Sequence, residues 1–175
     1  MRPVALRPVA LRLVALLLVA AGCAGVAPRL APRPSLRISQ LVDAGDAVRR
    51  ASTRLLVEGL RADAAGDAPR AKGQYERAIA IDPTNPYAYL VYARFELDRR
   101  QVAQARRFLD RARSLVEAER DAEPAPGVEA HLVGLRGAIE RASSGGTDAG
   151  AWLDRARELD PRAWSDGQLD AAELL

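Results

Sequence analysis

The sequence contains few of the residues from which catalytic and metal sites are built. Among its 175 residues there is one cysteine, Cys23, and one histidine, His131. A single cysteine allows no internal disulfide bond, and a lone histidine is much more often a structural helix residue than a catalyst. The sequence has no His-Glu-x-x-His, Cys-x-x-Cys or Gly-x-Ser-x-Gly motif and no phosphate-binding loop. We therefore expect no enzymatic activity, no cofactor and no metal site.

Residue types that favour β-strands are also scarce. Aromatic residues make up 5% of the chain, while alanine, leucine, arginine and glutamate dominate. These abundant residues have high helix propensity, whereas strands draw on β-branched and aromatic side chains. At this length the chain accommodates one modest domain with a tail, and its composition predicts the all-α class.

The formal net charge of +3 comes from the N-terminal end of the chain. Arg2, Arg7 and Arg12 precede Cys23 and no acidic residue does, whereas residues 41–175 hold 20 basic and 23 acidic side chains. A nucleic-acid-binding surface needs clustered positive charge. The sequence therefore predicts no nucleic-acid partner.

An apolar run near the N-terminus ends at a cysteine. The three arginines are followed by ten uncharged residues, 13–22, and then by Cys23. This is the charged-then-apolar plan of a secretory signal, and the run is shorter than the roughly 20 residues that a transmembrane helix needs. The stretch Val19-Ala20-Ala21-Gly22-Cys23 resembles a bacterial lipobox, although Ala20 stands where leucine is commonest.

The resemblance to bacterial lipoproteins implies that residues 1–22 are a cleaved signal peptide and that Cys23 becomes the lipidated N-terminus. Acyl chains such as palmitate anchor a protein at about 0.8 kcal/mol per buried methylene. Ala24, rather than aspartate, follows the cysteine, which implies the outer membrane, with the protein facing the periplasm. The alternative is an uncleaved leader with an incidental cysteine. Residues 23–40 contain three prolines and three arginines, a composition that predicts an extended tether.

Landmarks recur at a spacing of 34 residues in the remainder of the chain. The small residue Gly59 is matched by Ala93, and a second set recurs in the same way: Ala71, Tyr75 and Ala78 are matched by Ala105, Leu109 and Ala112. This pattern resembles the tetratricopeptide repeat, a helix–turn–helix unit. The resemblance implies an all-α solenoid of antiparallel helix hairpins over residues 41–175, with repeats at about 52–85, 86–119 and 130–163 and a C-terminal cap at 164–175.

Capping and turn signals predict where the helices begin and end. We expect helices at about 46–65, 68–81, 86–99, 102–119, 128–142 and 148–159, because Asp, Asn and Pro mark the starts and Gly or Asp-Pro the ends. Arg100 stands where the repeat family usually has a turn glycine. A capping-box spacing at Ser165–Gln168 predicts a last short helix at Leu169–Leu175.

In the repeat family the first helices of successive units line a concave face, which implies a partner-binding groove in this chain. The residues that would line it are Leu56, Leu60, Tyr87, Leu90, Arg94, Leu97 and His131. Leu56 and Leu60 replace polar groups of the family's clamp for peptide carboxylates, so an amphipathic helix or an extended apolar peptide is the expected ligand. The alternative is that these side chains are simply buried between neighbouring helices.

These expectations predict a membrane-anchored, periplasm-facing lipoprotein. It would act as a non-catalytic adaptor or scaffold in cell-envelope assembly, with a protein or peptide as partner and the lipid anchor on the membrane. Two alternatives stay open, namely a soluble cytoplasmic repeat adaptor and a structural, homo-oligomeric envelope component.

Overall fold

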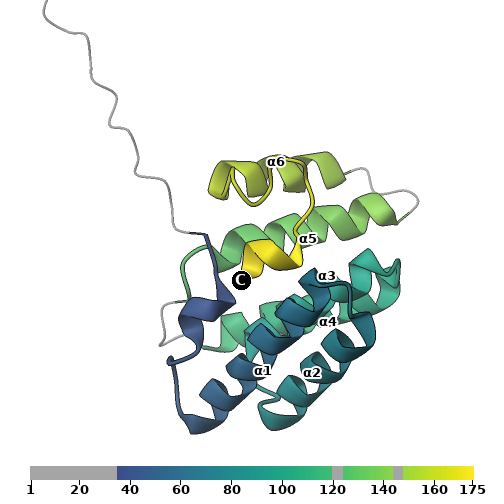
Figure 1. The fold of residues 1–175 in the computed structure, drawn as a ribbon. Helices are drawn as coiled ribbons and strands as arrows, with labels where there is room; N and C mark the ends of the chain where they lie inside the picture. Colours follow the sequence, from purple (N-terminus) through teal and green to yellow (C-terminus); the bar gives the residue numbers. More distant parts are fainter. Residues whose placement is uncertain (1–34, 120–123, 144–147) are drawn as a thin grey trace, which may run out of the picture. The chain divides into compact units, whose positions relative to one another are not determined.

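A computed structural model describes residues 35–119, 124–143 and 148–175 of the chain. In these ranges the chain forms six α-helices and two short 3-10 helices (Figure 1). The elements are η1 (Ile38–Leu41), α1 (Ala47–Ala64), α2 (Ala68–Ile81), α3 (Pro86–Asp98), α4 (Val102–Ala118), α5 (Val128–Ala142), α6 (Ala149–Leu159) and η2 (Ala171–Leu174). None of the described helices is long and apolar enough to span a bilayer. The predicted signal peptide and Cys23 lie outside the described residues.

The helices associate as consecutive antiparallel hairpins. α1 pairs with α2, α3 with α4 and α5 with α6, and each hairpin packs against the next through α2 and α3 or through α4 and α5. The first helices of the hairpins, α1, α3 and α5, also contact one another in sequence. This arrangement confirms the predicted all-α stack of helix hairpins.

The helix boundaries follow the sequence signals closely. The side chains of Asp46, Asp67 and Asn85 accept hydrogen bonds from backbone amides in the first turns of α1, α2 and α3, over 2.8, 3.2 and 3.1 Å. Such N-caps satisfy amides that a helix cannot pair internally. Gly66 ends α1 with φ 80°, and Arg100 follows α3 with φ 61°. Arg100 thus adopts the left-handed conformation of a turn glycine at a position 34 residues after Gly66.

The repeat landmarks are positions where helices approach closely. A Cβ atom on Gly59 would lie 2.4 Å from Cε1 of Tyr75. Gly137 holds the equivalent place in the predicted unit 130–163, and a Cβ atom there would lie 2.9 Å from Cγ of Leu153. The landmark alanines of α2, α3 and α4 are completely buried: Ala71, Ala78, Ala93, Ala105 and Ala112. The small residues therefore let the two helices of a hairpin meet, while the large partners fill the space between them.

The two ends of the described chain differ from expectation. Leu36 and Ile38, predicted to belong to the tether, are buried in the core. The predicted helix at Leu169–Leu175 is instead a single 3-10 turn at Ala171–Leu174, whose capping box joins Asp170 to Glu173 rather than starting at Ser165. Leu169 and Leu174 are both buried. In a continuous α-helix, residues five positions apart point about 140° away from each other, so a helix over this segment would not turn both side chains to the same side.

Candidate functional site

The predicted groove residues lie mainly in the interior. Five of the seven are buried, namely Leu56, Leu60, Leu90, Arg94 and His131, and the other two, Tyr87 and Leu97, are half-buried. They come from the first helices α1, α3 and α5, as the repeat pattern predicts. In this conformation the seven residues do not form one continuous open groove.

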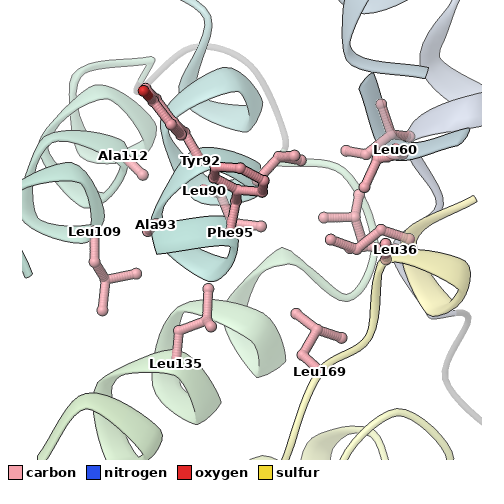
Figure 2. Close-up of a cluster of buried hydrophobic side chains, with 14 of the residues drawn as sticks. Leu36, Leu60, Leu90, Tyr92, Ala93, Phe95, Leu109, Ala112, Leu135 and Leu169 are labelled. Atoms are coloured by element: carbon pink, nitrogen blue, oxygen red, sulfur yellow. The ribbon is translucent and has the colours of Figure 1, made fainter. Parts of the chain in front are cut away.

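The chain's own end segments cover this inner face. The segments 35–42 and 163–175 pack on α1 through η1 and η2, and Figure 2 shows their Leu36 and Leu169 in one buried cluster with Leu60 of α1 and Leu135 of α5. The hydroxyl of Ser39 donates a hydrogen bond to the carbonyl of Leu175, which joins the two segments to each other. The inner face therefore already holds two apolar segments of the chain, each with no more than one 3-10 turn.

His131 is held in this interior by the C-terminal segment. Its Nδ1 accepts a hydrogen bond of 3.1 Å from Nε1 of Trp164, and both rings are fully buried. Burial lowers the pKa of His131 to about 4, against the opposing effects of Asp160 and the backbone of Leu36. The imidazole is therefore neutral at pH 7, and its surroundings give it a structural role.

Arg94 is a buried cation at the edge of the inner face. Its guanidinium donates to Asp98 over 2.5 Å and to Asp63 of α1, while its Nε has no partner among the described residues. Burial lowers the pKa of Arg94, and the nearby carboxylates of Asp98 and Asp170 oppose that shift. An arginine stays charged even so, so this site keeps a fixed positive group.

A hollow of about 510 Å³ remains beside Arg94, and we call it the inner hollow. It combines an aliphatic lining with three arginines and one carboxylate. Its residues are Arg94, Leu97, Asp98, Arg100, Val102, Leu135, Ala138, Arg141, Ala142, Gln168 and Leu169. Of the seven predicted groove residues, only Arg94 and Leu97 reach it. A ligand there needs apolar surface and at least one hydrogen-bond acceptor.

A second concavity, the outer hollow, lies between α2, α3 and α4 and has a volume of about 620 Å³. It contains two aromatic rings, two glutamates and two cations. Its residues are Lys72, Glu76, Ile79, Tyr92, Glu96, Arg99, Gln101, Gln104 and Phe108. The sequence prediction missed this site. The available signal was the spacing of Tyr92, Glu96 and Arg99, which places all three on one stripe of α3.

The two hollows lie on opposite sides of α3. Successive helical residues are separated by about 100°, so Tyr92 and Arg94 point about 200° apart around the helix axis. The same holds for Glu96 and Asp98. Most residues of α3 are buried. Its polar side chains reach these concavities on two sides, namely through Arg94 and Asp98 at the inner hollow and through Tyr92 and Glu96 at the outer hollow.

Nothing in the described ranges assembles a metal site, since no group of three or more histidine, cysteine, aspartate or glutamate side chains is close enough to hold an ion. The model of the tetratricopeptide repeat family matches residues 64–121, which include α2, α3 and α4. The match supports the interpretation of the chain as a tetratricopeptide repeat protein. Such repeats generally mediate protein–protein interactions and are generally non-catalytic. No curated protein and no solved structure matches the chain.

Proposed function

We propose that this protein is a lipoprotein anchored in the outer membrane through Cys23. It faces the periplasm and serves as a non-catalytic adaptor that holds a protein partner during cell-envelope assembly. The observation that carries the adaptor role is the inner hollow, an open site formed by first helices of a repeat stack and lined by Arg94 and Leu97.

The composition of the inner hollow suits a peptide. Leu97, Leu135 and Leu169 offer an apolar surface, and Arg94 adds a fixed positive charge to the wall of the hollow. A backbone carbonyl or an acidic side chain is attracted by that charge, and aliphatic side chains fill the remaining space. The neighbouring inner face supports this interpretation because the chain's own segment 163–175 already lies on it. A partner segment therefore enters a surface that accommodates irregular polypeptide.

The partner interaction is tested by crosslinking in cells. The photoreactive residue is placed at Leu97, which is half-buried and lines the inner hollow. The same probe at Arg107, an exposed residue of α4, is the control. Leu90 is unsuitable because it is completely enclosed. We expect a discrete adduct with another protein from position 97 alone. Equal adducts from both positions, or none, refute the inner hollow as the binding site, and adducts with a second copy of the chain support the homo-oligomeric alternative.

The membrane anchor is tested separately. The expected result is incorporation of a labelled fatty acid into the full chain and its loss in the Cys23→Ser variant, with the wild-type protein in the outer-membrane fraction. Ala24→Ser is the matched control, since it leaves the cysteine in place. An unlabelled wild-type chain in the cytoplasmic fraction refutes the anchor and favours the soluble adaptor, without affecting the crosslinking result.

A further inference from the structure

The outer hollow contains a carboxylate that forms no ion pair within the described chain. Glu96 is 7% exposed, and it is one of the residues that line the hollow. No described residue forms an ion pair with it, and the hydroxyl of Tyr92 lies within hydrogen-bonding reach of its side chain. The oxygens of Glu96 are not among the enclosed polar atoms that lack a partner, so its carboxylate opens onto the hollow. A cation that enters the hollow can therefore pair with it.

The nearby Tyr92 does not balance the charge of Glu96. The hydroxyl of Tyr92 has one proton, which it donates to Oε1 of Glu76 over 3.1 Å. Burial, then Glu76 and Glu96, raise the pKa of Tyr92 well above its ordinary range, so the hydroxyl of Tyr92 keeps its proton at pH 7. Glu96 is left to accept hydrogen bonds from outside the described chain.

The two cations that border the hollow are engaged elsewhere. Nζ of Lys72 lies 3.8 Å from Oε1 of Glu76 on a half-exposed pair, and the guanidinium of Arg99 lies 5.2 Å from the centre of the Phe95 ring. Neither forms an ion pair with Glu96. The outer hollow thus has room for one more cation.

Aromatic rings form the apolar part of the same hollow. Tyr92 and Phe108 are stacked, with ring centres 4.4 Å apart and planes 21° apart. Tyr75 and Phe95 lie 6.0 Å from Tyr92 on the buried side, so the pair is held rigidly. Aromatic rings attract cations and offer flat surfaces to planar groups.

We propose that the outer hollow binds an arginine side chain of a partner protein, with the guanidinium donating to Glu96 and lying against the rings of Tyr92 and Phe108. Arginine fits better than lysine because its planar fork forms two parallel hydrogen bonds to a carboxylate and also stacks on aromatic rings. The inference rests on the proposed adaptor function, since it assigns partner chemistry to a second surface of the adaptor. It does not depend on the lipid anchor or on the inner hollow.

The test uses the full chain in detergent micelles, with its four tyrosines replaced by 3-fluorotyrosine and observed by fluorine NMR. The probe is the capped pentapeptide Ala-Leu-Arg-Leu-Ala, and the same peptide with glutamine at its centre is the control. We expect a saturable shift of the Tyr92 resonance with the arginine peptide. Tyr87, whose hydroxyl accepts a bond from the amide of Ala125, serves as an internal reference and stays unshifted.

Two variants separate the proposed contact from general electrostatics. Glu96→Gln is expected to lower the affinity for the arginine peptide at least tenfold. Glu117→Gln changes an exposed residue paired with Arg113 and should leave the affinity unchanged. Lys72→Ala removes a half-exposed competing cation and is expected to strengthen binding several-fold. This variant keeps the proposal testable if Glu96→Gln does not fold.

Equal shifts with both peptides, or undiminished affinity in a folded Glu96→Gln protein, overturn the proposal. Weaker binding in Lys72→Ala does so as well. If these results coincide with a specific crosslink from Leu97, the adaptor function stands and only the arginine site is lost. If no crosslink forms while Tyr92 responds to the arginine peptide, the outer hollow is the working surface.

Discussion

Replacing Gly59 by alanine tests the close approach on which each helix hairpin depends. The added Cβ would lie 2.4 Å from Cε1 and 2.7 Å from Cδ1 of Tyr75. The ring cannot easily move, because it is completely buried and lies 5.4 Å from Phe95 and 6.0 Å from Tyr92, centre to centre. Overpacking of this kind typically costs about 1–3 kcal/mol.

A glycine-to-alanine change in a helix also gains about 1 kcal/mol from propensity, so a matched control is needed. Gly73 of α2 provides it, since a Cβ there meets no atom within 4 Å. We expect Gly73→Ala to raise the free energy of unfolding. The free energy of unfolding of Gly59→Ala should lie about 1–3 kcal/mol below that of Gly73→Ala. Urea unfolding of the full chain, followed by far-ultraviolet circular dichroism, measures both variants.

The second repeat indicates which additional substitution would restore the stability lost in Gly59→Ala. The positions equivalent to Gly59 and Tyr75 are Ala93 and Leu109, both buried, so a larger residue on one helix is paired with a smaller one on the other. Tyr75→Leu should therefore cost less in the Gly59→Ala background than in the wild type, even though it removes the 3.3 Å bond from the Tyr75 hydroxyl to Asp63. Equal stability gains in Gly59→Ala and Gly73→Ala would refute the packing argument.

Further predictions concern the turns, the histidine and an ion-pair cluster. Arg100→Gly should raise the free energy of unfolding by at most about 1 kcal/mol, and Gly66→Ala should lower it by about as much, because both positions have positive φ; urea unfolding of each decides. The pKa of His131 falls from 6.5 to about 4 on folding, so between these two pH values the unfolded chain binds a proton at His131 and the folded chain does not. Its contribution is complete above pH 6.5 and is lost as the pH falls toward 4, by at most about 3 kcal/mol; His131→Gln should remove this part of the pH dependence of urea unfolding. Arg49→Lys should cost about 1–3 kcal/mol, because Arg49 donates to the buried Asp82 over 2.5 Å; wild-type stability on thermal unfolding would contradict it.

The helices could be predicted from sequence because their signals are local. Asp46, Asp67 and Asn85 act as N-caps within three residues of the amides they bind, and Asp82-Pro83 ends α2 for a steric reason that concerns adjacent residues. The 34-residue repeat added the hairpin partners, since Gly59 and Tyr75 belong to one unit. No long-range information was required for either.

The cover of the inner face could not be predicted in this way. Leu36, Ile38, Leu169 and Leu174 belong to segments that contain no more than one 3-10 turn each, which is too short for a helical or strand period to indicate a buried side. The partner of His131 is likewise Trp164, 33 residues away in a segment without regular structure. The groove prediction concerns the inner faces of α1, α3 and α5, and the accessibility of these faces depends on segments at the far ends of the described chain.

The two charged residues near the middle of α3 show why its outer side carries the sharper functional signal. Arg94 and Glu96 are 2% and 7% exposed, and they point to opposite sides of the helix. Arg94 has Asp63 and Asp98 as acceptors, and packing of the end segments on the inner face accounts for its burial. Glu96 forms no ion pair in the described chain, although the residue is nearly as enclosed. A buried or half-buried charge is balanced either by a charge of the same fold or by a ligand. The carboxylates of Asp63 and Asp98 balance the charge of Arg94, whereas for Glu96 the outer hollow leaves that place to a cation of a ligand.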